Sequence, residues 1–175
     1  MPLITTTEMF KKAYEGGYAI GAFNVNNMEI IQGITEAAAE ERAPLILQVS
    51  AGARKYAKHI YLTKLVEAAI ADTDLPIALH LDHGTYDGCY KCIKAGFSSI
   101  MFDGSHYPIE ENIEKTKELV KVAHAMGLSL EAEVGSIGGE EDGVVGLGEC
   151  ADPRECKAIA DLGIDFLAAG IGNIH

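Results

Sequence analysis

The sequence predicts an α/β fold built on a parallel sheet, because short apolar segments alternate with longer amphipathic ones along its 175 residues. The apolar segments are nearly continuous, as is typical of strands that are covered on both faces. Polar side chains follow the end of each apolar segment. Six strands are therefore expected, within residues 18–25, 44–50, 76–84, 98–105, 129–134 and 165–175.

Capping residues and prolines place the helices between these strands. Asn27 can cap one helix, Gly96 can end another, and Pro108 and Pro153 can open two more. The expected helices cover residues 6–16, 28–43, 59–71, 87–95, 109–127 and a segment that begins at 153. Residues 135–150, which are rich in glycine and acidic residues, are expected to form a loop.

Two architectures fit this alternation, a doubly wound open sheet and a TIM (β/α)8 barrel. No G-x-G-x-x-G follows the first strand, which argues against a dinucleotide-binding fold. Side chains suited to chemistry follow every expected strand, and a barrel gathers such residues at that end. Because typical barrels have eight strands and about 250 residues, we expect residues 1–175 to form a single incomplete TIM-barrel domain of six βα units.

Composition excludes several kinds of partner. The 26 acidic and 14 basic residues give a net charge of −12, which argues against nucleic acid but not against a small phosphorylated substrate. No apolar stretch reaches the roughly 18 residues of a membrane span, and the N-terminus lacks the pattern of a secretion signal. We therefore expect a cytoplasmic protein that binds no membrane.

The four cysteines include a C-x-x-C, Cys89 and Cys92, which could indicate zinc or redox chemistry. Cys150 and Cys156 have the wrong spacing to complete a zinc ribbon. Residues three apart in a helix share one face, and Cys89 lies in an expected helix. The prediction is therefore that Cys89 and Cys92 are reduced, buried thiols.

The segment His80-Leu81-Asp82-His83-Gly84 is the first candidate for chemistry. Alternation places His80 and Asp82 on one face of a strand, the barrel interior. His83 is expected at the strand tip, where Gly84 lets the backbone turn. A histidine beside a carboxylate can bind a metal or transfer a proton. The alternative is a structural polar cluster satisfied by hydrogen bonds.

His175 is a second candidate metal ligand, because it also follows a strand end. A catalytic zinc needs three protein ligands and an open position. His106 follows the fourth strand and could reach the same mouth, whereas His59 and His124 are expected on helix surfaces.

Acidic residues form the third candidate feature. Glu131 and Glu133 alternate to the same face of the fifth expected strand. The loop that follows carries a second acidic group, residues 140–142, and could bring an acid or base over a bound substrate. Acidic loops beside glycines are also often merely solvated.

With these residues in view, the sequence closely resembles class II fructose-bisphosphate aldolases, a family that includes tagatose-bisphosphate aldolases. The matching segments occur in family order along the chain: GAFNVNN, PLILQVSAGA, LHLDHGTYDGCYKCIKAGFSSIMFDGSHYPIEENI, LEAEVGSIGGEEDGV and AAGIGNIH. The resemblance implies a zinc-dependent TIM barrel that cleaves fructose 1,6-bisphosphate into dihydroxyacetone phosphate and glyceraldehyde 3-phosphate. Tagatose 1,6-bisphosphate is the alternative substrate.

The resemblance also implies roles for individual residues. His83 and His175 would bind the catalytic zinc, and Asp82 would donate a proton to the aldehyde oxygen. Asp103 and Glu133 match positions of an alternative or second cation, divalent or monovalent. The remaining matches are Glu141, a loop acid for proton exchange, and the substrate-binding residues Ser50 and Asn24. The implied assembly is a homo-oligomer, a dimer or tetramer, acting on small sugar phosphates.

One expected part of the family's site is absent, a third histidine ligand followed by two glycines. A non-catalytic barrel remnant is therefore an alternative of another class. The sequence itself favours a metal over a lysine Schiff base as electron sink. Lys55 is expected in the loop after the second strand, and the other lysines lie on helices or just beyond them.

Overall fold

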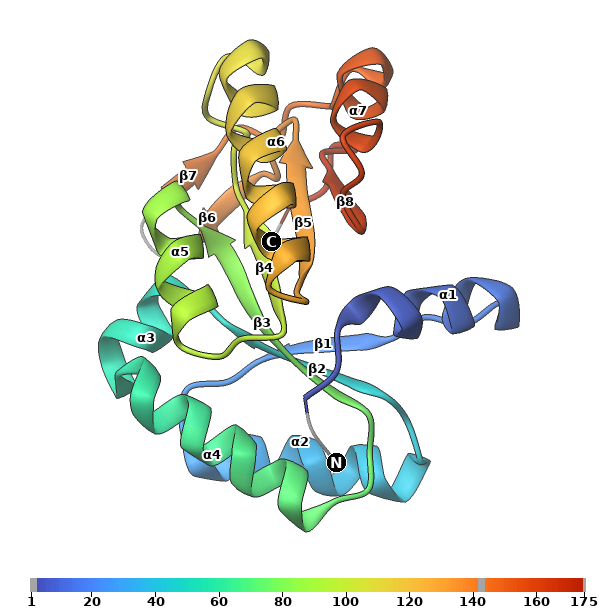
Figure 1. The fold of residues 1–175 in the computed structure, drawn as a ribbon, viewed down its shortest axis with the longest axis vertical. Coiled ribbons are helices and arrows are strands. Elements are labelled where there is room, and N and C mark those ends of the chain that lie inside the picture. Colours follow the sequence, from blue (N-terminus) through green and yellow to red (C-terminus); the bar gives the residue numbers. More distant parts are fainter. Residues whose placement is uncertain (1–2, 142–143, 175) are drawn as a thin grey trace.

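The computed structural model describes residues 3–141 and 144–174 and is centred on one six-stranded parallel sheet (Figure 1). The sheet order is β1-β2-β3-β4-β5-β8, so the chain adds each strand of the sheet beside the previous one. The strands are β1 (Gly21–Asn24), β2 (Leu45–Val49), β3 (Ile77–Gly84), β4 (Ser99–Phe102), β5 (Ser129–Val134) and β8 (Phe166–Ala169). This half-barrel with alternating helices confirms the expected incomplete TIM barrel.

The helices are α1 (Thr6–Gly16), α2 (Met28–Glu41), α3 (Ala51–Ala57), α4 (His59–Asp72), α5 (Tyr86–Lys94), α6 (Ile109–Ala125) and α7 (Pro153–Ala160). The predicted cap of α2 is confirmed, because the side chain of Asn27 accepts a hydrogen bond from the Ile30 amide at 2.9 Å. Gly96 takes a φ of 88° just past α5, which suits the predicted helix end. None of the described helices is long and apolar enough to cross a membrane.

Two expected loops contain regular structure. Residues 51–57 form α3, capped by Ser50, so Lys55 lies on a helix and not in a loop. Seven residues with a glycine in the first turn are too few to show helical periodicity. Within residues 135–150, β6 (Gly139–Glu141) and β7 (Val144–Gly146) pair as an antiparallel hairpin. Glycines and acidic residues obscure these short strands in the sequence.

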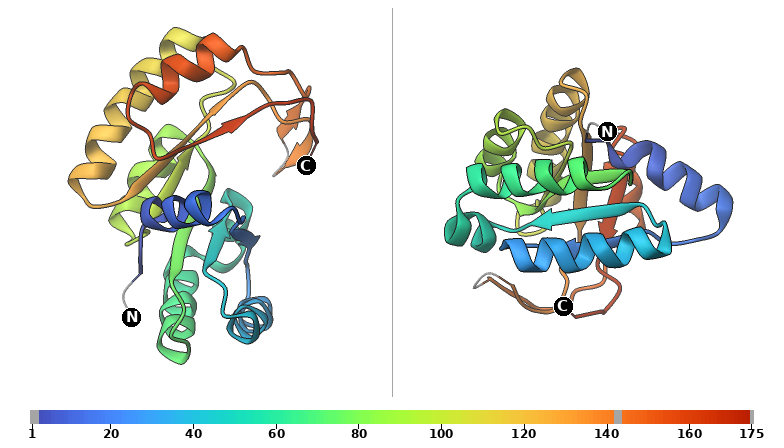
Figure 2. Two further views of the ribbon diagram at one scale, coloured as in Figure 1. Left: turned by 90° about the vertical axis from the view of Figure 1, so that its right-hand side faces the viewer. Right: turned by 90° about the horizontal axis from the view of Figure 1, so that it is seen from below.

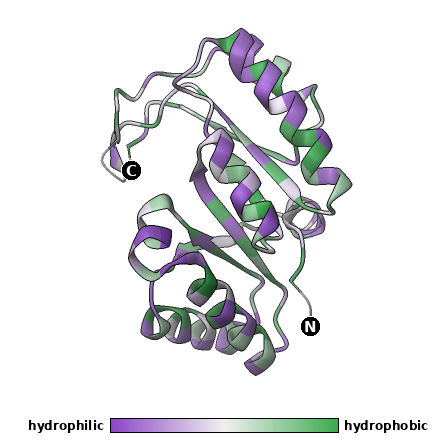
Figure 3. Cartoon of the chain, turned by 60° about the vertical axis from the view of Figure 1, so that its left-hand side comes forward, coloured by the Kyte–Doolittle hydropathy of each residue, from purple (hydrophilic) through white to green (hydrophobic). Residues whose placement is uncertain are grey.

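The two faces of the sheet bury different side chains. On the outer face, Leu45 and Leu47 of β2 pack in one core with Leu62 and Val66 of α4. On the inner face, the intervening Ile46 packs with Met9 of α1 and with a residue of β3. Figure 3 shows the matching alternation of hydrophilic and hydrophobic residues along the helices. The strands are therefore apolar on the outside, and the inner face is left for α1 and the polar residues.

A buried polar network joins α1 to the inner face of the sheet. The hydroxyl of Thr6 donates to Ser129 at 2.7 Å, and His80 shares a 2.7 Å hydrogen bond with Ser99. The other ring nitrogen of His80 lies 3.1 Å from a carboxylate oxygen of Glu131. Both ring nitrogens of His80 therefore make structural contacts, at a position on β3 that precedes the strand end.

Candidate metal and active site

A β-bulge in β3 brings the two candidate residues Asp82 and His83 to the same face. Leu81 pairs with Ile100 and Gly84 with Phe102, so three steps along β3 match two along β4. In a regular strand the two side chains would point to opposite faces. The extra residue turns His83 inward, and His83 itself adopts a φ of 44°. The expectation that Gly84 makes the turn is wrong, because Gly84 stays within the strand.

Gly84 is required for a different reason, close approach of the neighbouring strand. A Cβ at Gly84 would lie 2.5 Å from the backbone oxygen of Met101 and 2.5 Å from the side chain of Leu81. The glycine therefore lets β4 approach at the bulge.

Replacing Gly84 by alanine is expected to destabilise the fold by about 1–3 kcal/mol, since backbone must shift to make room. The free energy of unfolding from denaturant titration measures this. Gly33→Ala on α2 is the matched control. A Cβ at this position meets nothing within 4 Å, and the substitution replaces a glycine in the interior of a helix. A Gly84→Ala protein as stable as the control would contradict the close approach.

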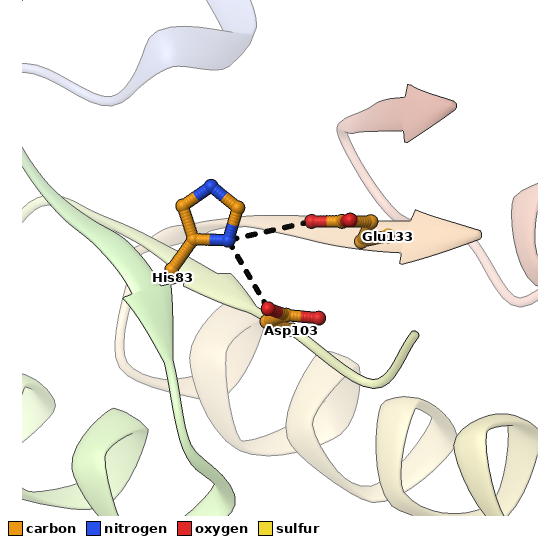
Figure 4. A group of neighbouring side chains, drawn as sticks. All are labelled: His83, Asp103 and Glu133. Atoms are coloured by element: carbon orange, nitrogen blue, oxygen red, sulfur yellow. Dashed lines mark hydrogen bonds and ion pairs between the residues drawn. The ribbon is translucent and has the colours of Figure 1, made fainter. Parts of the chain in front are cut away.

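The imidazole of His83 points toward two carboxylates from the next two strands (Figure 4). Its Nδ1 lies 3.1 Å from Asp103, just after β4, and 3.5 Å from Glu133 on β5. One potential ligand atom from each residue falls within 4.8 Å of the others, a spacing that could hold a metal ion. The structure thus brings together three of the four predicted metal residues.

The charges of this cluster are strongly coupled. Burial disfavours a charged His83, but the hydrogen bond with Asp103 and the neighbouring carboxylates outweigh it and raise the pKa of His83 to about 9. Burial, followed by the charge of Asp103, raises the pKa of Glu133 to about 7. Burial also opposes ionisation of Asp103, yet hydrogen bonds from His83 and Ser105 hold its pKa below the usual value. The raised pKa of His83 and the lowered pKa of Asp103 therefore indicate that the carboxylates of this cluster stabilise a positive charge beside them.

Glu133 provides a separate test of whether a cation fits. Its side chain is 2% exposed, and its Oε2 atom is buried without a hydrogen-bond partner among the described residues. A buried carboxylate oxygen normally has a partner, and bound cations are one way to satisfy it. Imidazole and carboxylate ligands suit zinc and other divalent ions. The residues that are present therefore fit a metal ion.

Asp82 lies beside this cluster and contacts a second predicted residue. The side chain of Asp82 is buried and accepts a 2.7 Å hydrogen bond from the Asn24 amide at the end of β1. Its charge is among those that raise the pKa of His83. Asp82 is thus held between a polar neighbour and the cluster.

Asn24 and Ser50 line one cavity of about 320 Å³ at the ends of β1 and β2. The family resemblance implies that both residues bind substrate, and the structure places them side by side. The remaining lining residues were not predicted to bind substrate: Val25, Asn26, Gly52, Ala53 and Tyr56. Helix α3, which the sequence did not predict, supplies three of the seven lining residues.

The hairpin β6–β7 is attached to the segment after β8 (Figure 2). The amide of Gly138 donates to the carbonyl of Asn173 at 3.0 Å, and Gly138 forms a bridge with Ile174. Two predicted site residues belong to these segments. The backbone of Glu141 ends β6, but its side chain lies outside the described part, as does all of His175. Their expected roles stay predictions.

The other histidines that the structure describes do not join the cluster. His106 is exposed, and its ring packs on Tyr107 with centroids 4.1 Å apart. His59 and His124 are exposed on helices, as expected, and His124 contacts Asp165 at 2.9 Å.

The C-x-x-C cysteines are buried free thiols on α5. Burial raises the pKa of Cys89 to about 12 and that of Cys92 to about 11, so both stay protonated at neutral pH.

We expect iodoacetamide at pH 8 to label the exposed Cys150 in the native protein and to label Cys89 and Cys92 only after unfolding. Mass spectrometry of peptides measures this. Equal native labelling of all three would contradict the burial.

The fold and the cluster together define a β/α-barrel protein with a candidate cation site at the carboxyl ends of its strands. A sequence model described as "Fructose-bisphosphate aldolase class-II" matches residues 4–175. The chain therefore belongs to the class-II fructose-bisphosphate aldolase family. This family is generally metal-dependent and acts on sugar phosphates.

Individual relatives agree with this assignment. The chain is 51% identical to a fructose-bisphosphate aldolase of Streptococcus pyogenes serotype M1 and 48% identical to one of Staphylococcus aureus, over its whole length. Among solved structures, the YdjI aldolase of Escherichia coli K12 matches 99% of the chain with a TM-score of 0.85 at 29% identity. The chain spans 61% of the Streptococcus relative, 63% of the Staphylococcus one and 64% of the YdjI chain.

Proposed function

We propose that the full-length protein carrying this sequence catalyses reversible aldol cleavage of fructose 1,6-bisphosphate. The products are dihydroxyacetone phosphate and glyceraldehyde 3-phosphate. The observation that carries the proposal is the β3 bulge, which sets Asp82 beside His83 while His83 meets Asp103 and Glu133. A proton-transfer group and candidate metal ligands thus lie side by side in a chain of this family.

The metal is proposed to be zinc, held by His83 and His175 as first ligands. Asp103 and Glu133 would serve as alternative ligands or hold a second divalent or monovalent cation. When bound, the metal ion supplies Lewis-acid polarisation of the ketose carbonyl, which makes the adjacent carbon–carbon bond easier to break. The buried Glu133 Oε2 atom makes no hydrogen bond among the described residues and lies 3.5 Å from Nδ1 of His83, which supports a cation in this position.

Asp82 is proposed to act as the acid and base on the aldehyde side. In cleavage its carboxylate takes the proton from the C4 hydroxyl, and in condensation it returns that proton to the aldehyde oxygen. The hydrogen bond from Asn24 holds one carboxylate oxygen, which fixes the side chain in place. Glu141 would exchange the proton on the three-carbon ketone.

Ser50 and Asn24 are the proposed ligands for the substrate. Their cavity adjoins Asp82 through the Asn24 amide, so a phosphate on the aldehyde fragment could occupy it while the reacting hydroxyl reaches the carboxylate. Hydroxyl and amide donors suit phosphate oxygens even in an acidic protein.

Fructose is favoured over tagatose as the sugar. The two Streptococcus and Staphylococcus relatives, about half identical to this chain, are both named fructose-bisphosphate aldolases. The two sugars differ only at C4, the carbon whose hydroxyl Asp82 would deprotonate.

The test is a coupled assay that follows triose phosphate release from each bisphosphate with the full-length, zinc-loaded protein. We expect a higher kcat/KM for fructose 1,6-bisphosphate. A higher value for the tagatose isomer would overturn the substrate. Turnover of neither sugar by a folded, zinc-loaded protein would favour a non-catalytic barrel.

A homo-oligomer, a dimer or tetramer, and a cytoplasmic location are further proposals that rest on the family resemblance. Light scattering of the purified full-length protein measures its mass in solution. A monomer would contradict the first of them.

A further inference from the structure

Helix α6 contacts the backbone of the candidate metal cluster through a buried asparagine. Asn112 is 2% exposed, and its Nδ2 donates a 2.9 Å hydrogen bond to the carbonyl oxygen of Glu133. Its Oδ1 accepts a 3.0 Å hydrogen bond from Thr116 one turn further along α6. The amide is therefore fixed at both ends, and it fixes Glu133 by the main chain.

The same side chain determines the path of the chain after Asp103. Gly104 follows Asp103 directly, and a Cβ on Gly104 would overlap Oδ1 of Asn112. Only glycine lets this loop lie against the asparagine. Asn112 thus contacts the neighbourhood of two of the three cluster residues.

Lys115 extends this contact to the third. It lies three residues after Asn112, on the same side of the helix. Its ammonium sits 4.6 Å from the ring centre of Tyr86 and 5.1 Å from that of Tyr107. Tyr86 comes three residues after His83, and Tyr107 four residues after Asp103. The lysine therefore links the start of α5, just after β3, to the loop that leaves β4.

The cluster needs such restraint for two reasons. His83 holds a φ of 44°, a conformation that costs energy and persists only where surrounding contacts enforce it. Asp103 and Glu133 also bring two carboxylates within 3.5 Å of the same ring nitrogen of His83, so their charges repel one another when both are ionised. Contacts from outside the cluster are therefore expected to help hold its geometry.

We propose that α6 is a brace for the metal cluster, with Asn112 and Lys115 as positioning residues that act through the backbone of Glu133, the start of α5 after His83 and the loop after Asp103. The proposal rests on the metal site of the proposed function. It adds residues that touch neither metal nor substrate, and it predicts that their loss weakens metal binding.

The first test is Asn112→Ala in the full-length protein. The dissociation constant of Zn²⁺ is measured on the metal-free protein by competition with a chelating dye, and the melting temperature is measured beside it. We expect zinc affinity to fall about 10–100-fold, as is usual when a residue that orients metal ligands is removed.

Ser98→Ala is the matched control. The Ser98 hydroxyl accepts a 3.1 Å hydrogen bond from the Leu79 amide, so this change also deletes a buried side-chain bond to a strand backbone, but at the amino end of β4. It should lower the melting temperature and leave zinc affinity unchanged. An Asn112→Ala protein that loses stability but keeps wild-type zinc affinity would overturn the brace.

If Asn112→Ala fails to fold, substitutions of Lys115 test the brace instead. Lys115→Met keeps the aliphatic stem and removes the charge over both rings, so zinc affinity should fall about three- to tenfold. Lys115→Arg keeps the cation and should restore it. Unchanged affinity in Lys115→Met would overturn the brace. Failure of the proposed function is recognised separately, because wild-type protein would then bind no zinc or cleave neither sugar.

Discussion

Replacing Asp82 by alanine is expected to lower kcat for fructose 1,6-bisphosphate cleavage about 10²–10⁴-fold, the usual contribution of a positioned acid or base. The buried carboxylate lies next to His83 in the β3 bulge and would have no substitute in the proton transfer. Steady-state kinetics of the full-length protein measure the loss. Bound zinc, determined on the same sample, should remain, because Asp82 is not a proposed ligand.

Asn24→Ala is a graded control for this prediction. It removes the amide that holds Asp82 at 2.7 Å and leaves the carboxylate in place, so its loss of kcat should be smaller. An Asp82→Ala protein with full activity would show that Asp82 does not move the proton.

Removing the metal is expected to abolish cleavage, and adding zinc back should restore it. The Lewis acid is the only electron sink in the proposal, because the sequence favours a metal ion over a lysine Schiff base. Lys55, expected near a strand end, lies exposed on α3. Activity is measured after exhaustive treatment with EDTA and again after titration with ZnCl₂.

A borohydride trap separates the two chemistries independently. Borohydride reduces a Schiff base to a stable amine and should not inactivate this protein in the presence of dihydroxyacetone phosphate. Full activity after chelation, or covalent trapping of the ketone on a lysine, would refute the metal-dependent route.

The periodicity of the sequence was sufficient to predict the architecture. Nearly continuous apolar runs such as Leu45–Val49 are long enough to identify buried parallel strands, and Asn27 and Pro108 mark helix starts by their local chemistry. The elements that the sequence did not predict are short or atypical in composition. Helix α3 has seven residues, and the hairpin β6–β7 has three residues in each strand.

The site was predicted in its residues but not in its geometry. Alternation alone places Asp82 and His83 on opposite faces, and a bulge depends on pairing with β4, which one strand's sequence does not encode. Asn112 was missed for a related reason. Its signal is a polar residue at an apolar position of an amphipathic helix, but its partner, the Glu133 carbonyl, is a backbone atom.

Anomalous diffraction at the zinc edge, from crystals of the zinc-loaded full-length protein, locates the bound metal. If His83 is a zinc ligand, a zinc peak lies about 2.0–2.1 Å from one of its ring nitrogens, the usual zinc–histidine distance. Zinc bound elsewhere, with no metal beside His83, would contradict it.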